Sequence, residues 1–113
     1  MIINETELIA TIRSIPDFPK EGILFRDITT LLKNADAYET LVESIAEKLR
    51  PLDVDIVIGP EARGFVIGSA VAYAVHAGFV LARKPGKLPC EVNSVSYGLE
   101  YGSDCLEIHK DAI

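Results

Sequence analysis

The sequence predicts an α/β fold with parallel strands, and three segments carry that prediction. Residues 54–58 are mostly β-branched and apolar, which is typical of a strand covered on both faces in a parallel sheet. Small and apolar residues at 64–76 favour a helix packed closely against a sheet, and residues 79–82 form a second apolar strand. A strand, a helix and a strand in this order predict a parallel pair joined by a right-handed crossover.

The residues at the N-terminus are expected to form a helix followed by a loop. Residues 4–14 carry apolar side chains at helical spacing, which predicts a short amphipathic helix. Pro16 and Pro19 stop that helix, so residues 15–22 are expected to form an ordered loop before a short extended piece at 23–25.

A longer helix is predicted at residues 36–50, where apolar side chains fall on one stripe. Asp36, with Glu39 three residues later, resembles a capping box, and Pro51 is expected to close the helix. Gly78 is expected to end the helix at 64–76.

The pattern changes after the second apolar strand. Residues 83–89 are expected to form a loop, and residues 92–97 and 105–108 to pair as short antiparallel strands. The connection at 98–104 is long for so small a domain, and such connections are usually functional or mobile.

Composition limits the class of protein. A chain of 113 residues has room for one modest domain, so residues 1–113 are expected to be a single domain. The net charge of −6 repels nucleic acid and anionic lipid, and neither is an expected partner. Residues 65–82 are too interrupted for a membrane span, and the N-terminus lacks a signal-peptide pattern, so we expect a cytoplasmic protein.

The two cysteines, Cys90 and Cys105, are not in a Cys-x-x-Cys arrangement and are expected to be reduced thiols. A zinc site would need His76 or His109, and neither histidine stands at a ligand spacing from a cysteine. No metal ligands are therefore expected among the side chains.

Two candidate anion sites follow the predicted strands. Arg63 lies between two glycines at the start of a helix, a position that suits a phosphate, although a plain turn with a solvated arginine fits equally well. Arg83, Lys84 and Lys87 come directly after the second strand and can neutralise a polyphosphate; the alternative is a solvated loop. Dinucleotide and Walker-type glycine motifs are missing from the sequence.

Two further segments carry aromatic side chains. Residues 96–102 place Glu100 and two tyrosines between glycines, which permits a lid whose glutamate exchanges a proton with a substrate; a hairpin turn is the alternative. Phe25 precedes an Arg-Asp pair and is either a core side chain or a ring that stacks on a flat ligand.

Taken together, residues 18–19 with 22–28, 61–65, 83–89 and 96–102 resemble the adenine phosphoribosyltransferases, of the type I phosphoribosyltransferase family, in order and at compatible spacing. The resemblance implies a parallel-sheet phosphoribosyltransferase core with an N-terminal hood segment and a flexible β-ribbon loop. It also implies transfer of ribose 5-phosphate from phosphoribosyl pyrophosphate to adenine, giving AMP and pyrophosphate in purine salvage. Mg²⁺ would be bound through phosphoribosyl pyrophosphate, and the enzyme would be a cytoplasmic homodimer.

The resemblance assigns roles to a base site and to the loop beside it. Phe25 matches the residue that stacks on adenine, and the backbone of Leu24 matches the reader of the base edge. Arg63 matches a position near the base. Ala62 lies in the loop that receives pyrophosphate, where the peptide between Glu61 and Ala62 is expected in the cis form.

The remaining matches concern the diphosphate and the lid. Arg83, Lys84 and Lys87 match residues around the pyrophosphate, with Arg83 expected to act across a dimer interface. Glu100 and Tyr101 match lid residues near the reacting centre, with Glu100 as the proton-transfer partner of adenine.

One departure stands out. The family's Thr-Gly-Gly-Thr loop, which cradles the 5-phosphate, would begin just after Ile113, so the chain is expected to be truncated and its sheet incomplete. Two alternatives therefore stay open: a non-catalytic purine-binding or regulatory remnant of the same fold, and a relative specific for 6-oxopurines.

Overall fold

The computed structural model describes residues 2–99 and 102–113, which divide into two compact units, Met1–Lys48 and Leu49–Ile113. Each unit is described by itself. The first unit contains, in chain order, α1 (Glu5–Ala10), β1 (Arg13–Pro16), β2 (Leu24–Asp27), α2 (Thr29–Leu32) and nearly all of α3 (Ala35–Leu49). The second contains η1 (Arg50–Leu52), β3 (Ile56–Pro60), α4 (Arg63–Val75), β4 (Gly78–Ala82), β5 (Val92–Leu99) and β6 (Gly102–His109).

The predicted helix at 4–14 is too long. It ends at Ala10, and residues 13–16 instead form β1, which pairs antiparallel with β2. The helix begins at a capping box in which Asn4 accepts a hydrogen bond from the Glu7 backbone N–H at 2.8 Å. The apolar spacing continued past Ala10, but pairing with a strand eight residues further along the chain decided the conformation of β1.

Asp27 explains the short helix α2, which the sequence analysis did not predict. Its carboxylate accepts hydrogen bonds from the Thr29 backbone N–H at 2.9 Å and the Thr29 hydroxyl at 2.7 Å. The Arg13 side chain, from the opposing end of β1, also donates to this carboxylate, at 3.0 Å from its Nε. These bonds, the Thr29 hydroxyl first, lower the pKa of Asp27 to about 2.

Helix α3 was predicted almost to the residue, but its N-cap was not. The Asn34 side chain accepts a hydrogen bond from the Ala37 backbone N–H at 3.1 Å, so Asn34 caps the helix and Asp36 lies in its first turn. The helix ends at Leu49, and Pro51 falls in the short 3₁₀ turn η1.

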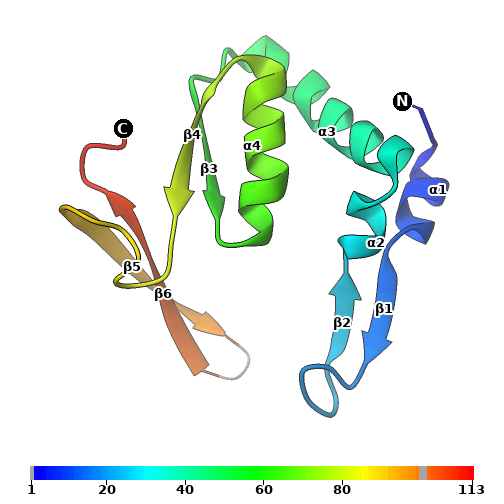
Figure 1. Ribbon diagram of the computed structural model, residues 1–113, viewed down its shortest axis with the longest axis horizontal. Coiled ribbons are helices and arrows are strands. Elements are labelled where there is room, and N and C mark those ends of the chain that lie inside the picture. The colour runs from blue at the N-terminus through cyan, green and yellow to red at the C-terminus, as the bar shows by residue number, and fades with distance from the viewer. Residues whose placement is uncertain (1, 100–101) are drawn as a thin grey trace. The chain divides into compact units, whose positions relative to one another are not determined.

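The predicted strand, helix and strand are confirmed in the second unit. β3 and β4 pair in parallel, with Ile56 opposite Gly78 and Pro60 opposite Ala82, and α4 runs beside them (Figure 1). The expected end of α4 at Gly78 is wrong: His76 takes the left-handed C-cap position at φ 59°, and Gly78 begins β4.

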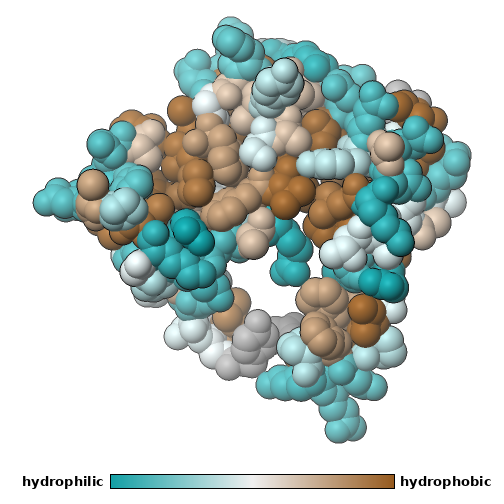
Figure 2. Space-filling model, in the orientation of Figure 1, coloured by the Kyte–Doolittle hydropathy of each residue, from teal (hydrophilic) through white to brown (hydrophobic). Residues whose placement is uncertain are grey.

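Glycines allow α4 to approach the strands closely. A Cβ on Gly59 would lie 2.4 Å from the Gly64 carbonyl oxygen, and a Cβ on Gly68 would lie 2.7 Å from the Phe79 ring. Because side chains alternate along a strand, Ile56 and Ile58 lie on the face of β3 opposite Gly59, where they remain 38% and 45% exposed. Apolar side chains are visible at the surface in Figure 2.

Antiparallel pairing of β5 with β6 is confirmed, but the long connection at 98–104 is wrong. The ladder runs from Val92 opposite His109 to Leu99 opposite Gly102, so the glycines at 98 and 102 belong to the strands. The glycines of this segment predicted a loop, but they lie at paired positions of the two strands. No helix within the described residues is long and apolar enough to cross a membrane.

Candidate functional site

The candidate site is built at the end of the β3–β4 pair. Glu61 follows β3 directly, and the basic loop, residues 83–89, follows β4. Because the strands are parallel, their carboxyl ends lie at the same edge, and the Glu61 backbone N–H donates to the Ala82 carbonyl at 3.0 Å. Parallel open sheets place their ligands at this edge.

The Glu61 carboxylate accepts hydrogen bonds from all three residues of the cationic cluster, which we define as Arg83, Lys84 and Lys87. Its Oε1 accepts hydrogen bonds from the Arg83 Nε at 3.3 Å and the Lys84 backbone N–H at 2.9 Å. Its Oε2 accepts one from the Lys87 Nζ at 2.7 Å. The Lys87 hydrogen bond, followed by that of the Lys84 backbone, lowers the pKa of Glu61 to about 2.

Lys84 also contacts the ribbon formed by β5 and β6. Its Nζ lies 2.9 Å from the Asp104 Oδ2 on β6. This hydrogen-bonded ion pair raises the pKa of Lys84 and lowers that of Asp104. The contact ties the basic loop to the ribbon.

Arg83 is held by backbone and side-chain contacts. It forms a two-way backbone bridge with Glu107 on β6, with N–O distances of 2.9 and 2.7 Å. Its guanidinium carbon lies 5.7 Å from the centroid of the Phe65 ring, a cation–π distance. Its side chain keeps 32% of its surface exposed.

The three predicted cations are therefore brought together, as the sequence analysis expected of a polyphosphate site. Their acidic partners Glu61 and Asp104 were missed, because these pairs join residues 20 to 26 positions apart. The position of Glu61 after the neighbouring parallel strand was the signal available for the first of them.

Ala62 and Arg63 directly follow Glu61 in the chain. Ala62 is the N-cap residue of α4, and Arg63 begins the helix with an exposed side chain. The peptide between Glu61 and Ala62 is cis, as the family resemblance implied. The loop therefore presents a helix N-terminus, which favours negative charge, next to three cations.

The predicted base-stacking residue lies in the first unit. Phe25, on β2, packs edge to face against Phe18, with ring centroids 5.1 Å apart and an interplanar angle of 75°. Leu24 is 50% exposed and Phe18 is 49% exposed. A flat ligand has an accessible aromatic pair here, and the expectations that Phe25 stacks on adenine and that Arg63 lies near the base stay predictions.

The lid residues Glu100 and Tyr101 lie outside the described residues. The paired strands that flank them, ending at Leu99 and beginning at Gly102, are described. Cys90 and Cys105 are free thiols. No cluster of three or more metal-ligating side chains occurs among residues 2–99 and 102–113.

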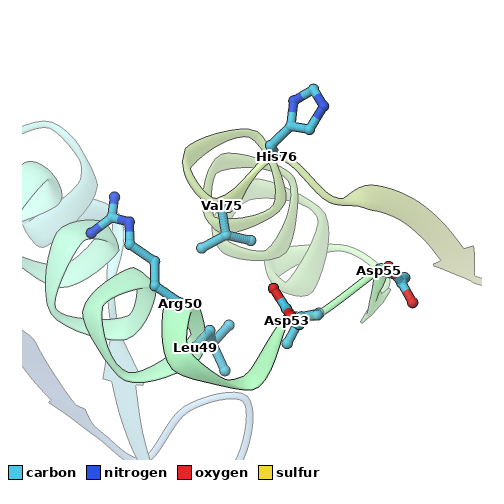
Figure 3. Close-up of a pocket in the computed structure, with 7 residues that line it drawn as sticks. Leu49, Arg50, Asp53, Asp55, Val75 and His76 are labelled. Atoms are coloured by element: carbon cyan, nitrogen blue, oxygen red, sulfur yellow. The ribbon is translucent and has the colours of Figure 1, made fainter.

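A separate cavity of about 490 Å³ lies at the opposite end of the β3 and α4 pair (Figure 3). It lies between η1, the residues that lead into β3 and the C-terminus of α4. The His76 ring and the Asp55 carboxylate point away from each other, so the polar groups do not converge on one ligand. None of the predicted site residues lines it.

Comparisons with known proteins identify the family of the chain. No family model matches the chain. The adenine phosphoribosyltransferase of Alkaliphilus metalliredigens is 61% identical over 102 residues, which are 90% of this chain and 60% of that protein. That of Pelobacter propionicus is 58% identical over 107 residues, or 95% of this chain and 62% of that protein.

A solved structure shares the fold. The crystal structure of adenine phosphoribosyltransferase from Thermoanaerobacter pseudethanolicus matches with a TM-score of 0.89 at 53% identity, covering 95% of this chain and 62% of that one. The chain spans about three fifths of the length of the relatives it matches. By sequence and by fold, the chain belongs to the adenine phosphoribosyltransferase family.

Proposed function

We propose that the protein transfers ribose 5-phosphate from phosphoribosyl pyrophosphate to adenine, giving AMP and pyrophosphate. The observation that carries this proposal is the cationic cluster, held by Glu61 at the carboxyl ends of two parallel strands. Such a cluster suits a leaving group that gains negative charge in the transition state. Membership of the family supplies the second argument.

The reaction breaks the bond between the ribose C1′ and a pyrophosphate oxygen and forms a bond from C1′ to a ring nitrogen of adenine. The pyrophosphate leaves with the bonding electrons, so Arg83, Lys84 and Lys87 stabilise the departing charge. The Lys87 and Lys84 ammonium groups now contact Glu61 and Asp104, and a bound diphosphate would offer them competing oxygens. No covalent nucleophile is needed.

We propose that Mg²⁺ enters with the substrate, bound to its diphosphate oxygens. Carboxylates are the side chains that Mg²⁺ prefers, and Glu61 and Asp104 already pair with cations. The ion would add positive charge to that of the cationic cluster.

Adenine is the base that we propose for the aromatic site. Phe25 would stack on the ring, and the backbone of Leu24 would read its edge. The adenine phosphoribosyltransferase of Saccharomyces cerevisiae, 39% identical to this chain and solved in complex with adenine and D-2,5-dideoxy-2,5-imino-altritol 1,6-bisphosphate, supports that choice; it matches with a TM-score of 0.88 and covers 96% of this chain and 64% of that one.

Glu100 and Tyr101 are proposed as lid residues, with Glu100 accepting the proton that the reacting adenine loses. Strand β5 ends at Leu99 and strand β6 begins at Gly102, so the described strands flank this pair. We further propose that residues 1–113 belong to one phosphoribosyltransferase domain, that the protein forms a cytoplasmic homodimer, and that it serves purine salvage.

The proposal is tested by calorimetry on the chain and by product analysis. We expect adenine to bind to the chain and to outcompete hypoxanthine, and AMP to form from phosphoribosyl pyrophosphate and Mg²⁺ in a protein that also carries the 5-phosphate loop. Adenine binding that does not respond to phosphoribosyl pyrophosphate would favour a non-catalytic purine-binding module. Preference for hypoxanthine would favour a 6-oxopurine enzyme.

A further inference from the structure

We propose that Glu107, on β6, is a positioning residue for the diphosphate site, because it holds the turn of the basic loop that presents Lys84 and Lys87. This inference rests on the proposed function, since it assigns a further residue to the same site. Glu107 would not touch the substrate.

The backbone of Glu107 fixes the start of the basic loop. Its N–H donates to the Arg83 carbonyl at 2.7 Å, and the Arg83 N–H donates to its carbonyl at 2.9 Å. This isolated bridge brings the side chain of Glu107 to the turn that follows Arg83.

The side chain of Glu107 then fixes the turn itself. Its Oε1 accepts the Gly86 backbone N–H at 3.1 Å, and its Oε2 accepts the Ser94 hydroxyl at 2.7 Å. Ser94 is the direct cross-strand partner of Glu107, so the ribbon orients the carboxylate toward the loop. Gly86 has φ +81°, a conformation that glycine adopts readily, and the Lys87 N–H closes the turn on the Lys84 carbonyl at 3.4 Å.

The Glu107 carboxylate accepts hydrogen bonds from different kinds of donor than Glu61 and Asp104 do. Glu61 and Asp104 contact the ammonium groups of Lys87 and Lys84, which a diphosphate would attract away. The Glu107 carboxylate contacts a backbone N–H and a hydroxyl, which an incoming anion does not need. Its contacts therefore persist when the lysines turn to the ligand.

Two physical effects of removing Glu107 have opposite signs. Loss of a negative charge near an anion site strengthens anion binding by Coulomb attraction. Loss of the hydrogen bond to Gly86 frees the turn, which must then be ordered again when the ligand binds, and this weakens binding. A positioning role predicts that the second effect dominates.

The test compares the dissociation constant of pyrophosphate with Mg²⁺ for the unaltered chain and three variants. Glu107→Ala should weaken binding roughly tenfold, the effect of one hydrogen bond of ordinary strength. Glu107→Gln keeps an acceptor for Gly86 and should stay within about twofold of the unaltered chain. Glu91→Ala removes a carboxylate near the start of the same ribbon, paired with Lys110 at 3.9 Å, and should change binding by less than about twofold.

The inference is overturned if Glu107→Ala binds pyrophosphate as tightly as the unaltered chain or more tightly. It is also overturned if Glu107→Gln loses as much affinity as Glu107→Ala, since an acceptor for the Gly86 N–H would then not maintain binding. A KM for phosphoribosyl pyrophosphate that rises in Glu107→Ala at nearly constant kcat would support it.

Amide hydrogen exchange separates this inference from the proposed function, because it needs no ligand. In Glu107→Ala the Gly86 amide should exchange roughly tenfold faster, while the β5–β6 ladder keeps its protection. If the unaltered chain does not bind pyrophosphate but Gly86 exchanges faster in Glu107→Ala, the diphosphate site is refuted and the role of Glu107 in holding the turn is retained. An unchanged Gly86 rate would refute the holding role.

If Glu107→Ala does not fold, the variant Ser94→Ala tests whether Glu107 holds the turn. It removes only the hydroxyl that orients Oε2 and leaves the carboxylate in place. We expect Gly86 exchange to rise by about twofold to threefold, and no change there would contradict the inference.

Discussion

Glu61 shows at the scale of one residue how the cationic cluster is assembled. It is a carboxylate with 11% of its side chain exposed, and it receives all three basic residues of the cluster through side-chain or backbone N–H groups. Because its cationic partners Arg83 and Lys87 are 32% and 47% exposed, these ion pairs contribute little to stability, and Glu61 acts mainly by preorganising the loop.

Replacing Lys87 with alanine should raise the pKa of Glu61 from about 2 toward its ordinary value of 4.5, because the Lys87 hydrogen bond is the largest cause of the shift. NMR titration of the Glu61 carboxyl group measures this. Lys110→Ala, which removes a lysine paired with Glu91, should leave the Glu61 titration unchanged. A Glu61 pKa near 4.5 in the unaltered chain would contradict the geometry.

The lowered pKa of Glu61 determines how the free energy of unfolding changes with pH. The pKa of Glu61 is lower in the folded chain than its ordinary value of 4.5, so its interactions contribute fully above that value. The contribution is lost as the pH falls from 4.5 through about 2, where the folded chain takes up the proton. The same sign holds for Asp27, with an ordinary pKa of 3.8 and a folded value of about 2.

At the residue scale, sequence reasoning found the cations and not their partners. Arg83, Lys84 and Lys87 are close together in the chain, so their spacing was visible. Their contacts with Glu61 and Asp104 depend on strand pairing and on the register of β5 with β6, neither of which local spacing encodes.

At the scale of elements, the ion pair between Lys84 and Asp104 couples the basic loop to the ribbon. Asp104→Asn should strengthen pyrophosphate binding by up to about fivefold, because it removes the competing anion from Lys84. The asparagine oxygen can still accept the Cys105 backbone N–H, which Asp104 now accepts at 2.8 Å. Calorimetry decides this, and weaker binding would show that the pair holds Lys84 in its binding position.

The packing of α4 on β3 gives a prediction about stability. Gly59→Ala should lower the free energy of unfolding by about 2 kcal/mol, because the added Cβ would meet a backbone oxygen 2.4 Å away. Urea unfolding measures the loss.

Gly98→Ala is the matched control, also a glycine in a strand. Apart from Gly98 itself and its two chain neighbours, no heavy atom of the described residues lies within 4 Å of a Cβ built at that position. Alanine should be neutral or stabilising there by about 0.5 kcal/mol. Equal effects of the two substitutions would contradict the close approach of α4 to β3.

Element prediction succeeded where a pattern was long and failed where partners were distant. The parallel pair and α3 follow from sustained periodicity and β-branched runs. The boundary between α1 and β1 was predicted wrongly because apolar residues continue from the helix into the strand. Only the pairing of β1 with β2 makes the second segment a strand. The ribbon was predicted too short because glycines at its tip were taken for a loop.

At the scale of the whole molecule, an acidic chain with a net charge of −6 concentrates three cations at one sheet edge. The charge pattern thus favours a small anionic ligand over a nucleic acid or an anionic membrane. Phe25 and the cationic cluster lie in separate units, Met1–Lys48 and Leu49–Ile113.

The central claim is that the cationic cluster binds a diphosphate, and calorimetric titration of the chain with pyrophosphate and Mg²⁺ tests it most directly. We predict saturable binding that Lys87→Ala weakens by roughly tenfold or more, because a charge-assisted hydrogen bond is lost, while the control Lys110→Ala binds normally. Equal affinity in the unaltered chain and in Lys87→Ala, or no binding to the unaltered chain, would contradict the account.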